Sequence, residues 1–247
     1  MGGSFVDCHS HVVPSGDDGA HSLPDGLELG RLAARAGTQI LYATPHVWPH
    51  LVLTEKREAA IRAAFQELRA AAPLELRLGF ELTPAPPLLG EDPARYALER
   101  TRVVLVEVPF AGQAGGLVAL AEHIEAARLV PLIAHPERTE AVRDRPGLAE
   151  ELSERGWPLQ VNSTSLLGRH GPEAEAIAWR LLENGHARAV ASDGHRLSRP
   201  ARLDDAYELV VARVGEEVAA PLFDGTALDL GLRAWRPTPS RAGARGA

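Results

Sequence analysis

The sequence predicts an α/β protein, a distorted seven-stranded TIM-like barrel of parallel strands. Two observations predict this class. Short, almost wholly apolar runs alternate with helical segments along the chain, and most of these runs end in a His, Asp or Glu. Continuous apolar runs are typical of parallel strands that are buried on both faces. Alternation of strands and helices indicates βα units, and seven units are one fewer than a regular barrel contains.

The strand pattern occurs in seven segments, namely residues 4–9, 40–44, 74–82, 103–108, 130–134, 158–161 and 189–192. Helices are expected over residues 54–72, 117–128, 146–155, 173–184 and 201–214. An earlier helix begins at a cap formed by Ser22 and Asp25, and Gly37 suits the position that follows its end. We expect one domain over residues 1–235 and a flexible Pro-, Gly- and Arg-rich tail over residues 236–247.

The composition narrows the classes of function. The chain has 247 residues, of which 45% are hydrophobic and 24% charged, as is ordinary for a globular protein. A net charge of −7 argues against broad nucleic-acid binding, which uses a basic face. The sequence has no secretory signal pattern and no apolar stretch of about 18 residues, so we expect no membrane insertion. The single cysteine, Cys8, favours a cytoplasmic location, and the oligomeric state cannot be predicted.

Polar side chains at the strand ends carry the candidate chemistry. Side chains alternate along a strand, so His9 and His11 point to the same side and can bind one metal ion. Active sites of barrel enzymes form where the carboxyl ends of the strands meet. We therefore expect one metal-binding cluster to contain His9, His11, Asp18, His46, Glu81, Glu107, His135, Asp193 and His195.

Five imidazoles and four carboxylates are too many ligands for one tetrahedral zinc ion. Nitrogen and oxygen donors without a thiolate indicate Mn, Zn or Fe in a multinuclear centre. Three divalent ions would bring six positive charges against the four carboxylates, leaving an excess of two. That excess suits a dianionic phosphate monoester.

Each of these residues also has a structural interpretation. Taken alone, His46 or His135 is more often a hydrogen-bonded core histidine than a metal ligand. Glu81 and Glu107 could be buried ion pairs, and Asp193 could begin a turn. The metal site is favoured because these explanations would have to hold at six of the seven strand ends. The remaining histidines are expected at the surface, namely His21, His50, His123, His170 and His186.

Nine short blocks between Val6 and Tyr207 resemble the PHP (polymerase and histidinol phosphatase) superfamily. Within it, they are most similar to the bacterial capsule-associated, manganese-dependent protein-tyrosine phosphatases. The blocks are Asp-Cys-His-Ser-His, Asp-Asp-Gly, Ala-Thr-Pro-His, Gly-Phe-Glu-Leu, Leu-Val-Glu-Val-Pro, Ile-Ala-His-Pro-Glu-Arg, Leu-Gln-Val-Asn-Ser, Ser-Leu-Leu-Gly and Ala-Ser-Asp-Gly-His.

The resemblance implies the PHP fold and three metal ions, with Mn²⁺ preferred and Zn²⁺ or Fe as alternatives. The implied ligand sets are His9, His11, Glu81 and Asp193 for one ion, Glu81, Glu107 and His135 for a second, and Asp18, His46 and His195 for a third. Arg138 and Arg199 match arginines that bind the substrate phosphate in this family. A planar guanidinium can pair with two phosphate oxygens, which supports that role.

The activity implied is direct hydrolysis of phosphotyrosine on a protein, with a tyrosine kinase that controls exopolysaccharide synthesis as the implied partner. A cysteine-based route is excluded, because it needs an arginine six positions after the nucleophile and Pro14 stands there relative to Cys8. One alternative is a PHP phosphoesterase acting on a small metabolite such as histidinol phosphate. Another is a metal-binding regulatory module without turnover.

Overall fold

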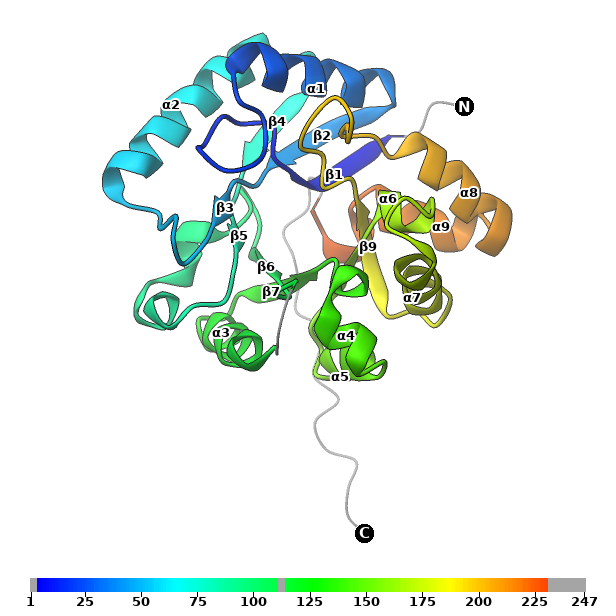
Figure 1. Cartoon of the computed structure of the whole chain (residues 1–247). Helices are drawn as coiled ribbons and strands as arrows, with labels where there is room; N and C mark the ends of the chain where they lie inside the picture. Colours follow the sequence, from blue (N-terminus) through cyan, green and yellow to red (C-terminus); the bar gives the residue numbers. More distant parts are fainter. Residues whose placement is uncertain (1–3, 111–113, 231–247) are drawn as a thin grey trace.

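The computed structural model describes residues 4–110 and 114–230, in which short strands lie at the centre and helices lie outside them (Figure 1). The strands are β1 Phe5–Ser10, β2 Thr38–Ala43, β3 His46–Val47, β4 Glu75–Leu78, β5 Glu81–Leu82, β6 Val103–Glu107, β7 Val130–Ala134, β8 Leu159–Asn162 and β9 Ala187–Ala191. The α-helices are α1 Leu23–Arg35, α2 Glu55–Ala71, α3 Gly115–Ala126, α4 Glu140–Asp144, α5 Leu148–Glu154, α6 Ser163–Leu166, α7 Pro172–Glu183, α8 Asp204–Val214 and α9 Glu216–Phe223.

The strands form two parallel sheets. One has three strands in the order β1-β2-β4, and the other has six in the order β3-β5-β6-β7-β8-β9. Every described pair of neighbouring strands is parallel, so the predicted α/β class with parallel strands is confirmed. A single closed barrel of seven strands is not what these residues form, because the strand ladders are interrupted at two places along the chain.

The first interruption divides the expected strand at residues 40–44 from the segment after it. Pro45 has no N–H to donate to a ladder, and Thr44 turns its N–H to the carbonyl of Ser10 at 2.7 Å. The second falls at Gly79, where an added Cβ would lie 2.5 Å from a side-chain carbon of Leu98. The Leu98 Cα would lie 3.1 Å from the same added Cβ, so the close packing against Leu98 favours glycine at this break between β4 and β5.

The first and last strands of the chain nevertheless meet. The N–H of His11 donates to the carbonyl of Gly194 at 2.7 Å, and the N–H of Asp193 donates to the carbonyl of His9 at 2.9 Å. These bonds link the two sheets just after β1 and β9 end. They place the polar residues at these two strand ends next to each other.

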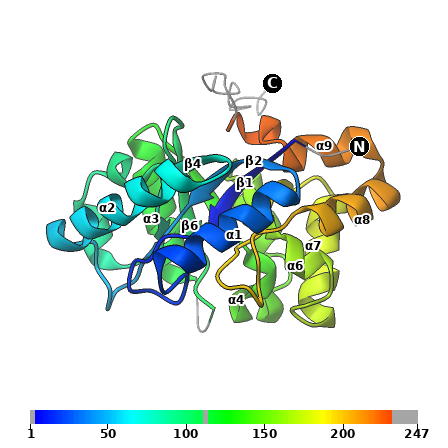
Figure 2. The same cartoon turned by 90° about the horizontal axis from the view of Figure 1, so that it is seen from above.

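Helix α1 begins and ends where the sequence predicts. Ser22 is its N-cap and accepts a hydrogen bond from the N–H of Asp25, while Gly37 follows the C-cap with a φ of +95°. That left-handed conformation costs glycine little. Helices α1 and α2 cover the three-stranded sheet (Figure 2), and α2 buries Ile61, Phe65 and Leu68 at helical spacing.

No helix within the described residues is long and apolar enough to cross a membrane. The expected helices after α1 appear as α2, α3, α5, α7 and α8, each with ends shifted by up to three residues. The short helices α4, α6 and α9 are additions to the prediction. The predicted tail at residues 236–247 lies outside the described residues.

Candidate metal centre

The side chain of Glu81, the first residue of β5, is fully buried and lies among four imidazoles. Its Oε2 atom is 3.1 Å from His9 Nε2, 3.2 Å from His11 Nε2 and 3.0 Å from His46 Nδ1. Its Oε1 atom is 2.9 Å from His135 Nε2. His9, His11 and His135 lie at or just after the ends of β1 and β7, whereas His46 and Glu81 begin the short strands β3 and β5 that follow β2 and β4. The convergence that the sequence predicts is present.

Two residues of this cluster have a left-handed backbone that is uncommon outside glycine. His135 follows β7 with a φ of +33°, and Asp193 follows β9 with a φ of +51°. Such conformations cost about 1–3 kcal/mol and concentrate at functional sites. Both strained residues belong to the hollow formed by the candidate ligands, which is called the cup below.

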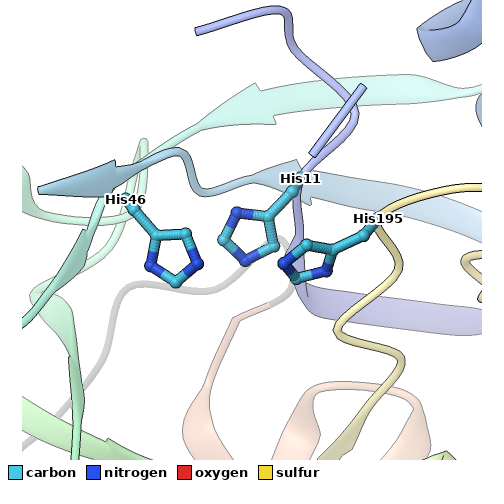
Figure 3. A group of neighbouring side chains, drawn as sticks. All are labelled: His11, His46 and His195. Carbon is cyan, nitrogen blue, oxygen red and sulfur yellow. The ribbon is translucent and has the colours of Figure 1, made fainter. Parts of the chain in front are cut away.

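Three histidines from distant segments form the second part of the cluster (Figure 3). His11, His46 and His195 place one ring nitrogen each within 4.8 Å of the others. Asp18 approaches them from its loop, with Oδ1 at 3.5 Å from His46 Nε2 and 3.4 Å from His195 Nε2. The Asp18 side chain is 55% exposed, so this part of the cup opens to solvent.

The described residues contain four groups of donor atoms close enough to hold an ion. They are His11 with His46 and His195, His9 with Glu81 and His135, His9 with His11 and Asp193, and His46 with Glu81 and Glu107. All nine residues proposed from the sequence are thus in this region, eight in these groups and Asp18 beside the first. The groups overlap more than the three separate ligand sets implied by the resemblance.

The charges of two buried carboxylates favour a cation between them. Burial alone would raise the pKa of Glu81, but the imidazoles around it hold its pKa well below the usual range. Burial, together with the negative charge of Glu81, raises the pKa of Glu107 to about 8. Thr83 donates its hydroxyl to Glu107. Two carboxylates so placed remain ionised together only when positive charge compensates them.

The residues fit a bound metal. Buried polar atoms without a hydrogen-bond partner include Glu81 Oε2, His46 Nδ1 and His135 Nδ1. His9 Nε2 and His11 Nε2 face each other at 3.1 Å, where only one of the two can supply a hydrogen. Divalent ions satisfy such facing lone pairs, and imidazole and carboxylate donors suit Mn, Zn and Fe.

The two arginines proposed from the sequence meet at Asp193. Arg138 Nη1 lies 2.6 Å from Asp193 Oδ2, and Arg199 Nη2 lies 3.8 Å from Asp193 Oδ1. A tight turn places Arg199, because the N–H of His195 donates to the Arg199 carbonyl at 2.9 Å. The guanidinium groups therefore line the same side of the cup, as an anion site requires.

Several residues in contact with the cluster have no role in the sequence prediction. Gln160 Oε1 lies 3.0 Å from His9 Nδ1, and the Asn162 amide donates to Asp193 Oδ2 at 2.8 Å. Asp17 contacts His11 Nδ1 at 3.6 Å. The Asp-Asp-Gly and Leu-Gln-Val-Asn blocks contain these residues, but only three-dimensional contacts distinguish a ligand from its support.

The surface prediction holds for two of the five remaining histidines, whereas His123, His170 and His186 are partly buried. His170 is partly buried, because Ser165 Oγ lies 3.0 Å from its Nδ1 atom and helix α6 packs beside it. Burial and the nearby charge of Arg138 lower its pKa to about 4. His21 and His50 are exposed as expected. Nothing in the Ser-Leu-Leu-Gly block indicates that the histidine after it turns inward.

The chain belongs to the CpsB/CapC family of capsular polysaccharide synthesis, whose model matches residues 5–230. It is 32% identical over 237 residues to the tyrosine-protein phosphatase YwqE of Bacillus subtilis, covering 91% of each chain. It is 27% identical over 232 residues to the tyrosine-protein phosphatase CpsB of Streptococcus pneumoniae, covering 89% of this chain and 95% of that one.

Solved structures agree with this placement. A chain from the crystal structures of YwqE from Bacillus subtilis and CpsB from Streptococcus pneumoniae, described as metal-dependent tyrosine phosphatases, superposes with a TM-score of 0.79. Its identity is 30%, over 88% of this chain and 91% of that one. Dihydropyrimidinase from Brevibacillus agri shares the fold alone, with a TM-score of 0.64 and 13% identity over 92% of this chain and 70% of that one.

Proposed function

We propose that this chain is a metal-dependent protein-tyrosine phosphatase with the PHP fold. The observation that carries the proposal is the convergence of nine candidate ligands and two arginines at the strand ends of a CpsB/CapC-family chain. A cup rich in imidazole and carboxylate, with guanidinium groups on one side, suits a phosphate monoester.

The proposed centre holds three divalent ions, with Mn²⁺ preferred and Zn²⁺ or Fe as alternatives. The proposed ligands are His9, His11, Asp18, His46, Glu81, Glu107, His135, Asp193 and His195. Support comes from the facing nitrogens of His9 and His11 and from the central position of Glu81, which can bridge two ions. When bound, the ions would supply an activated water and neutralise charge on the phosphate oxygens.

The proposed catalytic role of this chain's own side chains belongs to Arg138 and Arg199. Their guanidinium groups would bind phosphate oxygens and stabilise the charge that develops in the transition state. Asp193 holds Arg138 in place through the 2.6 Å contact, so its charge is oriented before substrate arrives. A phenol with a pKa of about 10 is a better leaving group than an alcohol, which reduces the need for a general acid.

The substrate class follows from the relatives, which are tyrosine-protein phosphatases. We propose a phosphotyrosine protein in capsule or exopolysaccharide synthesis as the substrate, and a bacterial tyrosine kinase as the partner. A cytoplasmic location and a single domain over residues 1–235 stay part of the proposal.

A substrate panel on metal-reconstituted protein tests this function. Turnover is compared on a phosphotyrosyl peptide, a phosphoseryl peptide and histidinol phosphate, with metal stoichiometry measured on the same sample. We expect the highest kcat/KM on the phosphotyrosyl peptide and close to three ions per chain. Higher kcat/KM on histidinol phosphate would favour the small-metabolite alternative. A chain that binds metal but turns over none of these substrates would favour the regulatory module.

A further inference from the structure

A cavity of about 400 Å³ adjoins the candidate metal centre on the side of Arg138. Its walls include Phe110, Arg138, Arg143 and His170, together with the first turn of α7. None of the nine candidate ligands is among the residues that line it. The cavity is within the size range of small-ligand pockets, and Arg138 connects it to the cup.

Phe110 is the aromatic wall of this cavity, three residues beyond the end of β6. Its ring is stacked on His135, with centroids 5.3 Å apart and planes 15° apart, and the Arg138 guanidinium lies 4.8 Å from its centroid. The Phe110 carbonyl accepts a hydrogen bond from the N–H of Glu140 at 3.0 Å. Phe110 is still 43% exposed, so a fixed ring is available to a ligand.

His170, on another part of the cavity wall, is fixed as well. The fully buried Glu137 accepts the Ser165 hydroxyl at 2.7 Å, and Ser165 Oγ lies 3.0 Å from His170 Nδ1. These two contacts, from Glu137 to Ser165 and from Ser165 to His170, hold the His170 imidazole at the cavity. Both walls are therefore organised by contacts within the protein, which lowers the entropic cost of binding.

The position of the cavity fits the part of the substrate that leaves. In-line attack on phosphorus places the leaving oxygen opposite the attacking water. If ions held by the nine candidate ligands supply that water, the leaving group would lie on the side of the phosphate away from it. Arg138 contacts both Asp193 and the Phe110 ring, so a phosphate bound to Arg138 has the cavity beside it.

We propose that this cavity is an aryl subsite in which Phe110 packs against the phenyl ring of the substrate. The inference rests on the proposed phosphatase function and adds the residue that selects aromatic over aliphatic phosphate esters. An aromatic pair contributes about 0.5–1.5 kcal/mol beyond area burial, which corresponds to roughly a 2- to 13-fold change in affinity. Another aromatic ring near the cup, Trp48, is stacked on both His46 and His50 and does not line this cavity.

The test uses benzylphosphonate and methylphosphonate, which share a head group and differ in the ring. Their dissociation constants are measured by calorimetry on metal-loaded protein, so the test does not depend on turnover. The wild type should bind benzylphosphonate more tightly, and Phe110→Ala should reduce this selectivity about 2- to 13-fold. Phe110→Tyr should retain it, and Leu209→Ala on α8 serves as the matched exposed apolar control.

Three outcomes would overturn the inference. They are a wild type without aryl selectivity, an equal loss of both phosphonates in Phe110→Ala, and a loss of selectivity in Trp48→Leu instead. Equal loss would mean that Phe110 only positions Arg138. Hydrolysis of a phosphotyrosyl peptide is measured on the same wild-type sample. Its absence alongside intact aryl selectivity would reject the proposed function while leaving the subsite in place.

Discussion

Asp17 lies directly behind His11, with its Oδ2 atom 3.6 Å from His11 Nδ1. The same oxygen accepts a hydrogen bond from the N–H of His46 at 3.0 Å, so one carboxylate orients two candidate ligands. Burial opposes ionisation of Asp17, but its contacts with His11 and His46 lower its pKa below the usual range. Asp17 therefore supports two candidate ligands without being one itself, whereas its neighbour Asp18 approaches the cluster from the side that is open to solvent.

Asp17→Asn should weaken metal binding about 10- to 100-fold, because the carboxylate that orients and polarises His11 is lost. At saturating metal, most of the activity should return. Metal affinity is measured by titration with Mn²⁺, and Asp25→Asn on the surface of α1 is the matched control. Unchanged affinity in Asp17→Asn would show that His11 does not depend on this contact.

Metal removal should abolish activity and lower thermal stability together. Without cations, Glu81 and Glu107 are left as adjacent buried carboxylates, with the pKa of Glu107 raised to about 8. EDTA should stop hydrolysis of a phosphotyrosyl peptide, and added Mn²⁺ should restore both the activity and the melting temperature.

A thiol reagent provides the control for this experiment. Cys8 is 1% exposed and burial raises its pKa, so an alkylating reagent should leave the native enzyme active. Activity that survives complete metal removal would contradict the proposed centre. Loss of activity on alkylation of the folded protein would contradict the structural role of Cys8.

More of the candidate site than of the fold could be predicted from the sequence. A polar residue at the end of an apolar run is a local signal, and parallel strands bring such ends together by topology, so His9 and Glu81 could be paired in advance. The breaks at Pro45 and Gly79 depend on contacts with Ser10 and Leu98, which no local pattern contains.

The supporting side chains could not be predicted for the same reason. Gln160 and Asn162 lie on β8 at alternate positions, as buried strand residues do, and only the fold shows that they reach His9 and Asp193. His170 is another such case, because its contact with Ser165 depends on how α6 ends.

Arg138 should matter to catalysis through its geometry as well as its charge. Arg138→Ala should lower kcat/KM on a phosphotyrosyl peptide about 100- to 1,000-fold, as the loss of one preorganised donor does elsewhere. The kcat/KM of Arg138→Lys should fall between those of the wild type and Arg138→Ala, because an ammonium group keeps the charge but cannot make the paired contact of a guanidinium.

Steady-state kinetics and inhibition by inorganic phosphate check this prediction. Phosphate should inhibit Arg138→Ala more weakly, and Arg188→Ala, an exposed position on β9, should behave like the wild type. Undiminished phosphate inhibition in Arg138→Ala would assign the residue to support of Asp193 and not to substrate binding.

His170 should make the metal-free protein less stable as the pH falls. Burial and the charge of Arg138 lower its pKa in the folded state to about 4 from the ordinary value of 6.5. Between these values the unfolded chain binds the proton more readily than the folded chain does, so stability is retained above pH 6.5 and is lost as the pH falls toward 4.

Denaturant unfolding at several pH values in this window should show a shallower decline in the free energy of unfolding for His170→Gln than for the wild type. His21→Gln, at an exposed histidine, is the matched control and should follow the wild type. Parallel declines for His170→Gln and the wild type would mean that His170 takes up its proton as easily in the fold as in the unfolded chain.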